Sequence, residues 1–212
     1  MKCDRNTMLL YAITDRAWTG KQSLAEQVES ALKGGATCVQ LREKELSDAE
    51  FLASAIELSA LCKRYGVPFF VNDNVEIAIE CGADGVHVGQ DDMAAGAVRA
   101  RIGENKILGV SAETVEQAVQ AEKNGADYLG VGAMFPTFTK LDTEPVTFDT
   151  LKAICSAVTI PVVAIGGINE QNIIQLKGSG IAGVAVVSAI FAQPDITAAA
   201  SRLAVLTRKA VE

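Results

Sequence analysis

Eight short apolar segments alternate with segments of helical periodicity along the chain, and this alternation limits the folds available to it. The apolar segments lie at 8–14, 38–42, 68–73, 85–89, 106–111, 128–134, 161–167 and 183–190. Strands that are separated by helices pair in parallel, because a parallel pair needs a long crossover connection. The pattern therefore predicts an α/β protein built on a parallel sheet.

The residues that lead into these strands form a weak repeat of two alternating kinds. GGATC, CGADG, NGADY and GSGIAG precede the even-numbered strands, whereas YGVP, IGENK and VTIP precede the third, fifth and seventh. The repeating unit is therefore βαβα, present four times, and four such units close into a (β/α)8 TIM barrel. We expect residues 1–212 to form one such barrel domain. An open doubly wound sheet is the alternative, but eight regular units leave no edge strands.

Helical periodicity is expected between the strands and after the last one. The predicted helices span 23–35, 47–66, 75–82, 93–103, 114–125, 148–158, 169–180 and 196–212. Ser47 and Glu50 have the spacing of a capping box at the start of the second helix. Five residues of that helix approximate one apolar stripe with the 3.6-residue period. They are Phe51, Ile56, Leu58, Leu61 and Cys62.

Charge and cysteine content exclude several classes of protein. The net charge of −7 argues against nonspecific nucleic-acid binding, so an anionic ligand would need a local cationic pocket. No apolar run approaches the roughly 20 residues that span a bilayer, and the N-terminal stretch lacks the shape of a signal peptide. Five cysteines without a C-x-x-C pair predict reduced thiols in a cytoplasmic protein. The oligomeric state stays open, a homo-oligomer included.

The end of the second predicted strand carries an amide and two cations. Because side chains alternate along a strand, Gln40, Arg42 and Lys44 share one face, and apolar Val39 and Leu41 share the face toward the helices. The active sites of such barrels lie at the carboxyl ends of the strands. An arginine beside a lysine at that mouth suits a pyrophosphate. The alternative is a solvated rim in which the cations pair with neighbouring glutamates.

Carboxylates follow the third and fourth predicted strands. Asp73 and Asp92 lie just past neighbouring strand ends, which are about 4.8 Å apart, so both can reach one ion. Two carboxylates combined with substrate phosphate oxygens and water suit Mg²⁺. The alternative is helix capping, by Asp73 or Asn74 for one helix and by Asp92 for the next.

Two further polar residues lie on the fourth and fifth strands. His87 is the single histidine and has apolar neighbours, so we expect a hydrogen-bonded core residue rather than a base or metal ligand. Ser111 ends the fifth strand and is either a hydroxyl ligand or a helix cap.

The loops after the last three strands are the remaining candidates. Residues 135–143 are expected to form an unusually long loop with hydroxyls at Thr137 and Thr139, one lysine and flanking aromatic residues, which is typical of a lid. Gly166 and Gly167 follow the seventh strand, and Val187 and Ser188 follow the eighth. Loops at these two places often bind phosphate through backbone N–H groups.

Taken together, these segments resemble the thiamin-phosphate synthase family. The matching stretches are LYAITD, VQLREK, FVND, GVHVGQDD, GVSAET, GADYLGVGAMFPTFTKLD, PVVAIGGI and GVAVVSAI. They follow the family's order and cover nearly the whole chain. The resemblance implies a Mg²⁺-dependent enzyme that joins hydroxymethylpyrimidine diphosphate to a thiazole phosphate and releases pyrophosphate. Its partners would be small phosphorylated molecules, with no nucleic acid and no membrane.

The resemblance also implies roles for individual residues. Around the pyrimidine diphosphate it places Gln40, Leu41, Arg42, Glu43, Lys44, Asn72, Ser111 and Lys140, with Gln40 on the pyrimidine. The catalytic set among these is Arg42, Lys44, Ser111 and Lys140. Around the thiazole phosphate it places Thr137, Phe138, Thr139, Gly167, Val187 and Ser188. Asp73 and Asp92 would bind Mg²⁺.

Two other functions share this barrel. A thiazole tautomerase would keep the phosphate site, but the resemblance leads us to expect a histidine base where this chain has Ala112. A catalytically silent protein that binds thiazole phosphate would not need the cations and carboxylates that this chain carries, so their presence argues against this alternative.

Overall fold

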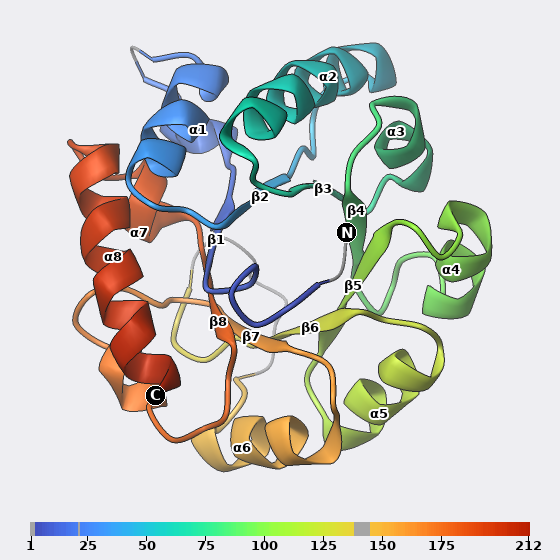
Figure 1. The fold of residues 1–212 in the computed structure, drawn as a ribbon, viewed down its shortest axis with the longest axis vertical. Coiled ribbons are helices and arrows are strands. Elements are labelled where there is room, and N and C mark those ends of the chain that lie inside the picture. The colour runs from blue at the N-terminus through green and yellow to red at the C-terminus, as the bar shows by residue number, and fades with distance from the viewer. Residues whose placement is uncertain (1–2, 21, 138–144) are drawn as a thin grey trace.

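The computed structural model describes residues 3–20, 22–137 and 145–212, and in these residues eight parallel strands close into a barrel (Figure 1). The strands are β1 (Leu10–Ile13), β2 (Cys38–Leu41), β3 (Phe69–Asn72), β4 (Gly85–Val88), β5 (Ile107–Ala112), β6 (Tyr128–Val131), β7 (Val162–Ile165) and β8 (Gly183–Val186). Tyr11 of β1 is in register with Cys38 of β2 on one side and with Ala185 of β8 on the other, so the ring has no edge. The predicted TIM barrel is confirmed.

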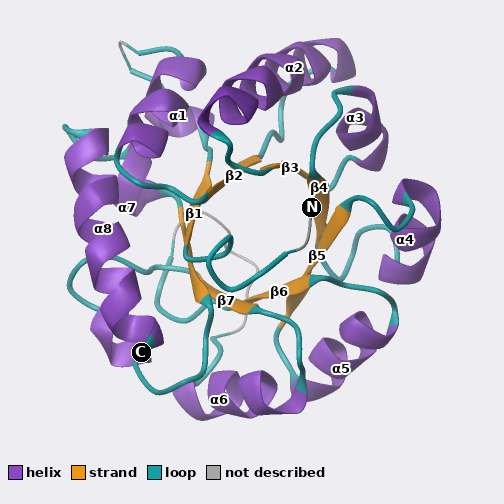
Figure 2. Cartoon of the chain, in the orientation of Figure 1, coloured by secondary structure: helices purple, strands orange, loops and turns teal. Residues whose placement is uncertain are grey.

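Helices surround the strands on the outside of the ring (Figure 2). They are α1 (Leu24–Lys33), α2 (Asp48–Tyr65), α3 (Val75–Glu80), α4 (Ala95–Ile102), α5 (Val115–Lys123), α6 (Phe148–Ala157), α7 (Ser188–Phe191) and α8 (Ile196–Val211), with 3₁₀ turns η1 (Arg16–Trp18) and η2 (Ile173–Leu176). No helix in the described part of the chain has the length and apolar character to cross a membrane.

The repeat in the strand lead-ins has a structural cause. Each even-numbered strand is preceded by a glycine with positive φ, where a side chain would be strained. These are Gly35, Gly82, Gly125 and Gly180. Two residues later, Thr37, Asp84 and Asp127 accept a hydrogen bond from the backbone N–H near the start of the preceding strand. The repeated motif therefore turns the chain and satisfies a strand N–H in three of the four units.

Asp84→Ala is expected to destabilise the barrel by about 1–3 kcal/mol, because it removes the acceptor, 2.9 Å away, of the Phe69 backbone N–H. Urea unfolding measures the change. Asp84→Asn is the matched control, since it loses the same charge but keeps an acceptor oxygen, and we expect it to cost less. Equal losses in the two variants would mean that charge, rather than this hydrogen bond, matters.

The predicted secondary structure and apolar stripe need correction chiefly in three places. Within 169–180 only η2 is helical, because the side chains of Asn169 and Asn172 bond to nearby backbone groups in place of helical partners. The predicted strand 183–190 ends at Val186, and α7 begins at Ser188; a short apolar run does not distinguish strand from helix.

The third correction concerns the apolar stripe of α2. Ile56 is 51% exposed, whereas Ala55 is buried in its place. At about 100° per residue, position 56 lies well off the line of the other four residues, which are buried as predicted. The capping box between Ser47 and Glu50 is present.

The buried side chains form two layers on either side of the strands. A helix-side cluster, which includes Val39 and Leu41 as predicted, fills the space between the strands and the helices. An interior cluster fills the ring itself and contains Tyr11, Phe70 and Tyr128, whose ring centroids are 5.4–5.9 Å apart. Residues 3–9, which precede β1, cross the opening at the amino ends of the strands (Figure 1). The opposite opening, at the carboxyl ends, is therefore the place for a site.

Candidate active site

A cation and two carboxylates meet where β2, β3 and β4 end. Lys44 Nζ lies 2.8 Å from Asp73 Oδ2, and Asp73 in turn lies beside Asp92. The Asp73 backbone has φ of 61°, which is uncommon outside glycine, and its N–H donates to the His87 carbonyl oxygen at 2.8 Å. The loop after β3 thus holds Asp73 toward its neighbours. We call Arg42, Lys44, Asp73 and Asp92 the mouth cluster.

The electrostatics of Asp73 reflect this arrangement. Burial raises the pKa of the Asp73 carboxyl, the Lys44 side chain lowers it, and the Asp92 carboxyl raises it, with a net upward direction. Burial and a second carboxylate both disfavour a negative charge at Asp73. A bound divalent cation would offset that cost.

The two carboxylates fit Mg²⁺ in part. Among the described residues, no group of three or more histidine, cysteine, aspartate or glutamate side chains is arranged to hold a metal ion. The protein therefore offers two carboxylates, and the other ligands would be substrate phosphate oxygens and water, as Mg²⁺ commonly accepts.

Helix capping does not explain these carboxylates. Asn74 is the N-cap residue of α3 and accepts from the Ile77 N–H at 3.0 Å. The N-cap residue of α4 is Ala94, which makes no side-chain cap, whereas Asp92 accepts from the Gly89 N–H at 2.7 Å. The capping alternative is thus correct for Asn74 and wrong for Asp73 and Asp92.

The cations of the mouth cluster do not pair with Glu43, as the alternative required, although the Lys44 side chain is exposed. Glu43 pairs instead with Arg16 at 2.7 Å, and its side chain is only 4% exposed. Arg42 is half-buried, and its backbone N–H donates to the Thr14 hydroxyl at 3.1 Å. No described residue accepts a hydrogen bond from its guanidinium, so the planar donor group is available to an anion.

Three other residues that were predicted around the pyrimidine diphosphate lie in different surroundings. Asn72 ends β3 and is half-buried next to Asp73. The Leu41 side chain is fully buried in the helix-side cluster, so Leu41 could contact a ligand only through its backbone. Glu43 is likewise held by Arg16.

Inside the ring, five polar side chains from five strands form one hydrogen-bonded row, here called the interior chain. Its members in order are Gln40, Tyr11, Tyr128, His87 and Ser111. His87 is hydrogen-bonded in the core, as predicted. Ser111 is not a helix cap, because Thr114 caps α5. The tyrosines were not among the predicted site residues, although strand alternation and their polar tips could have marked them.

The loop after β6 lies against the end of β7. The Met134 and Phe135 N–H groups donate to the Ile165 and Gly166 carbonyls at 2.9 and 3.0 Å. Phe135 packs on the helix-side cluster, and Thr137 is half-buried. Phe138, Thr139 and Lys140 lie outside the described residues.

Gly167 and the pair Val187–Ser188 follow the neighbouring strands β7 and β8. Asn172 donates to the Gly167 carbonyl at 2.9 Å, and no described residue accepts from the Gly167 N–H. Ile165 is in register with Ala185. Gly167 and Val187 each lie two positions further along the chain, so they leave the barrel side by side. This is the part of the mouth where a phosphate is expected.

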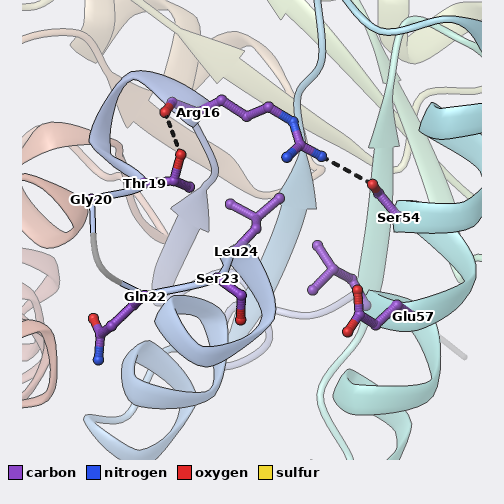
Figure 3. A pocket seen from close by; sticks show the side chains of 9 residues that line it. Arg16, Thr19, Gly20, Gln22, Ser23, Leu24, Ser54 and Glu57 are labelled. Atoms are coloured by element: carbon purple, nitrogen blue, oxygen red, sulfur yellow. Dashed lines mark hydrogen bonds between the residues drawn. The ribbon is translucent and has the colours of Figure 1, made fainter.

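A cavity of about 350 Å³ lies apart from these residues, between the loop after β1 and helices α1 and α2 (Figure 3). It is lined by Arg16, Thr19, Gly20, Gln22, Ser23, Leu24, Ser54, Glu57 and Leu58. None of the predicted site residues lines it. Arg16 is already bound to Glu43 and, at 3.0 Å, to the Ser54 hydroxyl, so the cavity offers an anion little.

The similarity of this chain to known proteins extends over the strands that form the mouth. A family model described as thiamine monophosphate synthase matches residues 10–190. Thiamine-phosphate synthases from Ruminiclostridium cellulolyticum and Alkaliphilus oremlandii are 52% and 51% identical over 194 residues, covering 92% of this chain and 92% and 93% of theirs. A solved structure, thiamine phosphate pyrophosphorylase from Pyrococcus furiosus, has a TM-score of 0.91 at 38% identity, covering 98% of this chain and 99% of that one. All the predicted site residues lie within the matched span.

Proposed function

The chain belongs to the thiamine monophosphate synthase family, and from this premise we propose how its mouth residues carry out the reaction. It is a transferase of thiamine biosynthesis. It condenses 4-amino-5-hydroxymethyl-2-methylpyrimidine diphosphate with 4-methyl-5-(2-hydroxyethyl)thiazole phosphate and yields thiamin phosphate and pyrophosphate.

The observation that carries the proposed mechanism is the mouth cluster. Lys44, Asp73 and Asp92 form a contiguous group at three neighbouring strand ends. Arg42 lies two residues before Lys44 in the sequence, and no described residue accepts a hydrogen bond from its guanidinium. A diphosphate carries several negative charges, which two cations and a metal-binding carboxylate pair suit. An acidic protein thereby provides one local place for a strongly anionic substrate.

The reaction needs charge stabilisation more than it needs a nucleophile. The bond between the pyrimidine methylene carbon and the diphosphate oxygen breaks, its electron pair leaves with pyrophosphate, and the thiazole nitrogen attacks the resulting pyrimidine cation. Arg42, Lys44 and Asn72 would bind the departing pyrophosphate as its charge grows. Groups that are held in place before the charge develops contribute most to such a step.

Asp73 and Asp92 would hold Mg²⁺. The ion would supply positive charge to the diphosphate oxygens beyond what the two cations provide. Support for this role comes from the position of Asp73 beside Asp92, where burial and the second carboxylate outweigh Lys44 and raise the pKa of the Asp73 carboxyl.

The thiazole phosphate would bind across the mouth, at the ends of β7 and β8. Gly167 would donate its backbone N–H, and Val187 and Ser188 would contribute backbone groups and a hydroxyl. Thr137 lies on the loop that packs against β7 and is proposed to contact the same substrate. Phe138 and Thr139 are proposed to do so from the resemblance alone.

The test is a coupled assay on purified protein with both substrates and Mg²⁺. Thiamin phosphate is detected after oxidation to fluorescent thiochrome, with EDTA as the control. Product that disappears with EDTA supports the reaction and the metal together. No product from folded protein would contradict the proposed reaction.

Lys140→Ala is expected to lower kcat more than it weakens binding of thiazole phosphate. The resemblance pairs Lys140 with charge that appears on the leaving pyrophosphate, so its contribution belongs to the transition state. Steady-state kinetics with the thiazole phosphate varied separates the two effects. A change confined to KM would contradict this role.

A further inference from the structure

The interior chain is an unbroken row of hydrogen bonds across the ring. Gln40 Nε2 lies 2.8 Å from Tyr11 Oη, the two tyrosine hydroxyls are 2.8 Å apart, and Tyr128 Oη lies 2.9 Å from His87 Nδ1. His87 Nε2 lies 3.0 Å from Ser111 Oγ. Its two ends, Gln40 and Ser111, are residues at which the family resemblance places the pyrimidine diphosphate. The three inner members join these two ends to each other.

Each hydrogen bond of this row uses one hydrogen, so the choice of donor in one bond determines the donor in the next. The Gln40 amide nitrogen is a donor only, and Tyr11 therefore accepts from it and gives its own hydrogen to Tyr128. Tyr128 then gives its hydrogen to His87 Nδ1. A neutral imidazole that accepts at Nδ1 carries its hydrogen on Nε2, and Nε2 donates to Ser111.

Burial keeps the tyrosine hydroxyls in the role of donors. Tyr11 and Tyr128 are 1% and 0% exposed. Burial raises the pKa of both phenols well above the ordinary value, so both retain their hydrogens. In the opposite direction Tyr128 would donate to Tyr11, and the Tyr11 hydrogen would face an amide N–H₂ group in the buried interior, at the cost of an unsatisfied donor.

We infer that Tyr11, Tyr128 and His87 are positioning residues that give the interior chain a single direction and so orient its two ends toward the substrate. At one end the Gln40 carbonyl oxygen, which no described residue engages, is presented as an acceptor. At the other end the Ser111 hydroxyl, which accepts from His87, keeps its hydrogen for donation. This inference rests on the proposed function for what the ends bind, but the direction itself does not.

The two ends then match the chemistry of the pyrimidine diphosphate. An amino group on the pyrimidine is a donor and suits the Gln40 oxygen. The departing pyrophosphate is an acceptor and suits the Ser111 hydrogen. With the Gln40 amide turned over so that its oxygen accepts from Tyr11, the row would run the other way, Gln40 would present N–H groups and Ser111 a lone pair, and both contacts would be mismatched.

The direct test uses the fact that the chain has a single histidine. Protein labelled with ¹⁵N-histidine gives one imidazole, and two-dimensional ¹H–¹⁵N spectra of the substrate-free protein at about pH 8 identify the protonated nitrogen. We expect hydrogen on Nε2 and an unprotonated, hydrogen-bonded Nδ1. Hydrogen on Nδ1, or on both nitrogens, would overturn the inferred direction.

Tyr128→Phe then removes the donor to Nδ1, and Tyr65→Phe is the matched control because Tyr65 is a surface residue that bonds to Glu29. The Nδ1 resonance is expected to move downfield in Tyr128→Phe and to stay in place in Tyr65→Phe. An unchanged resonance in both variants would overturn the link to Tyr128. Thermal melting of each variant shows whether the protein remains folded, and the wild-type spectrum alone keeps the inference testable if Tyr128→Phe does not fold.

Kinetics test whether the tyrosine acts through Ser111. Tyr128→Phe is expected to lower kcat about tenfold in the native background and less than about twofold in a Ser111→Ala background, because positioning has no effect once the positioned hydroxyl is gone. Equal losses in both backgrounds would indicate a merely structural tyrosine. A wild-type enzyme that shows the expected Nε2 hydrogen but makes no product would contradict the proposed function and leave the direction standing.

Discussion

Asp92→Asn is expected to lower Mg²⁺-dependent formation of thiamin phosphate by on the order of 10²–10³-fold or more, to the background without metal. The carboxylate pair of Asp73 and Asp92 supplies the protein's share of the proposed Mg²⁺ site. An amide is a neutral and weaker ligand for a hard cation, and it leaves Asp73 as the single carboxylate. Turnover is measured over a range of Mg²⁺ concentrations, so that lost affinity for the metal is separated from a lost rate at saturation.

The design of this variant keeps the loop after β4 intact. The Gly89 N–H donates to Asp92 Oδ2 at 2.7 Å, and the amide that replaces the carboxylate retains an oxygen that can accept this bond. Asp91→Asn is the matched control, because Asp91 is exposed, adjacent in sequence and of equal charge. We expect it to retain near-native turnover. Undiminished turnover in Asp92→Asn, or equal losses in the two variants, would contradict the metal assignment.

The fold was predictable because the repeat follows from local chemistry. A glycine that needs positive φ, followed two residues later by a hydrogen-bonding side chain, recurs at Gly35, Gly82 and Gly125, and Gly180 continues it without the polar partner. Each instance marks the start of an even-numbered strand. The segment 169–180 was mispredicted because its asparagine side chains compete with helical backbone bonds, which periodicity alone does not reveal.

The site was predictable only as far as strand alternation and chain order reach. They placed Gln40 inside the ring and put Asp73 and Asp92 at neighbouring strand ends. Lys44 lies beyond Leu41, the last residue of β2 that pairs with β3. Its contact with Asp73 therefore depends on the conformation of the loop that follows β2. Strand alternation does not reach that far, so this contact could not be predicted.

The interior chain was out of reach for a different reason. Tyr11 and Tyr128 are 117 positions apart and meet only because the barrel closes. Single-strand patterns identify each as inward-facing, but the partner is set by the register of strands that are distant in sequence. The burial of polar tips inside an apolar ring could have signalled that they need partners.

Gly109→Ala is expected to destabilise the protein by about 3 kcal/mol or more, because Gly109 is where β5 makes room for the interior chain. A Cβ at this position would overlap the ring and hydroxyl of Tyr128 and come within 2.5 Å of His87 Nδ1. Tyr128 is fully buried between neighbouring strands, so its ring has nowhere to move without breaking contacts with Tyr11 and Phe70. The methyl group therefore displaces the hydrogen bond that joins Tyr128 to His87.

Urea unfolding measures the change in the free energy of unfolding in Gly109→Ala. Gly96→Ala is the control, and its expected change has the opposite sign. Gly96 lies in α4, where a methyl group would meet no described atom within 4 Å, and alanine favours helix. Gly96→Ala is therefore expected to stabilise by up to about 1 kcal/mol. The ¹⁵N-histidine spectrum of Gly109→Ala should also change, since His87 loses its tyrosine partner. A Gly109→Ala protein that unfolds at the native urea midpoint with an unchanged histidine spectrum would contradict the close packing of β5 against the interior chain. A methyl group at this position has no other direction in which to point.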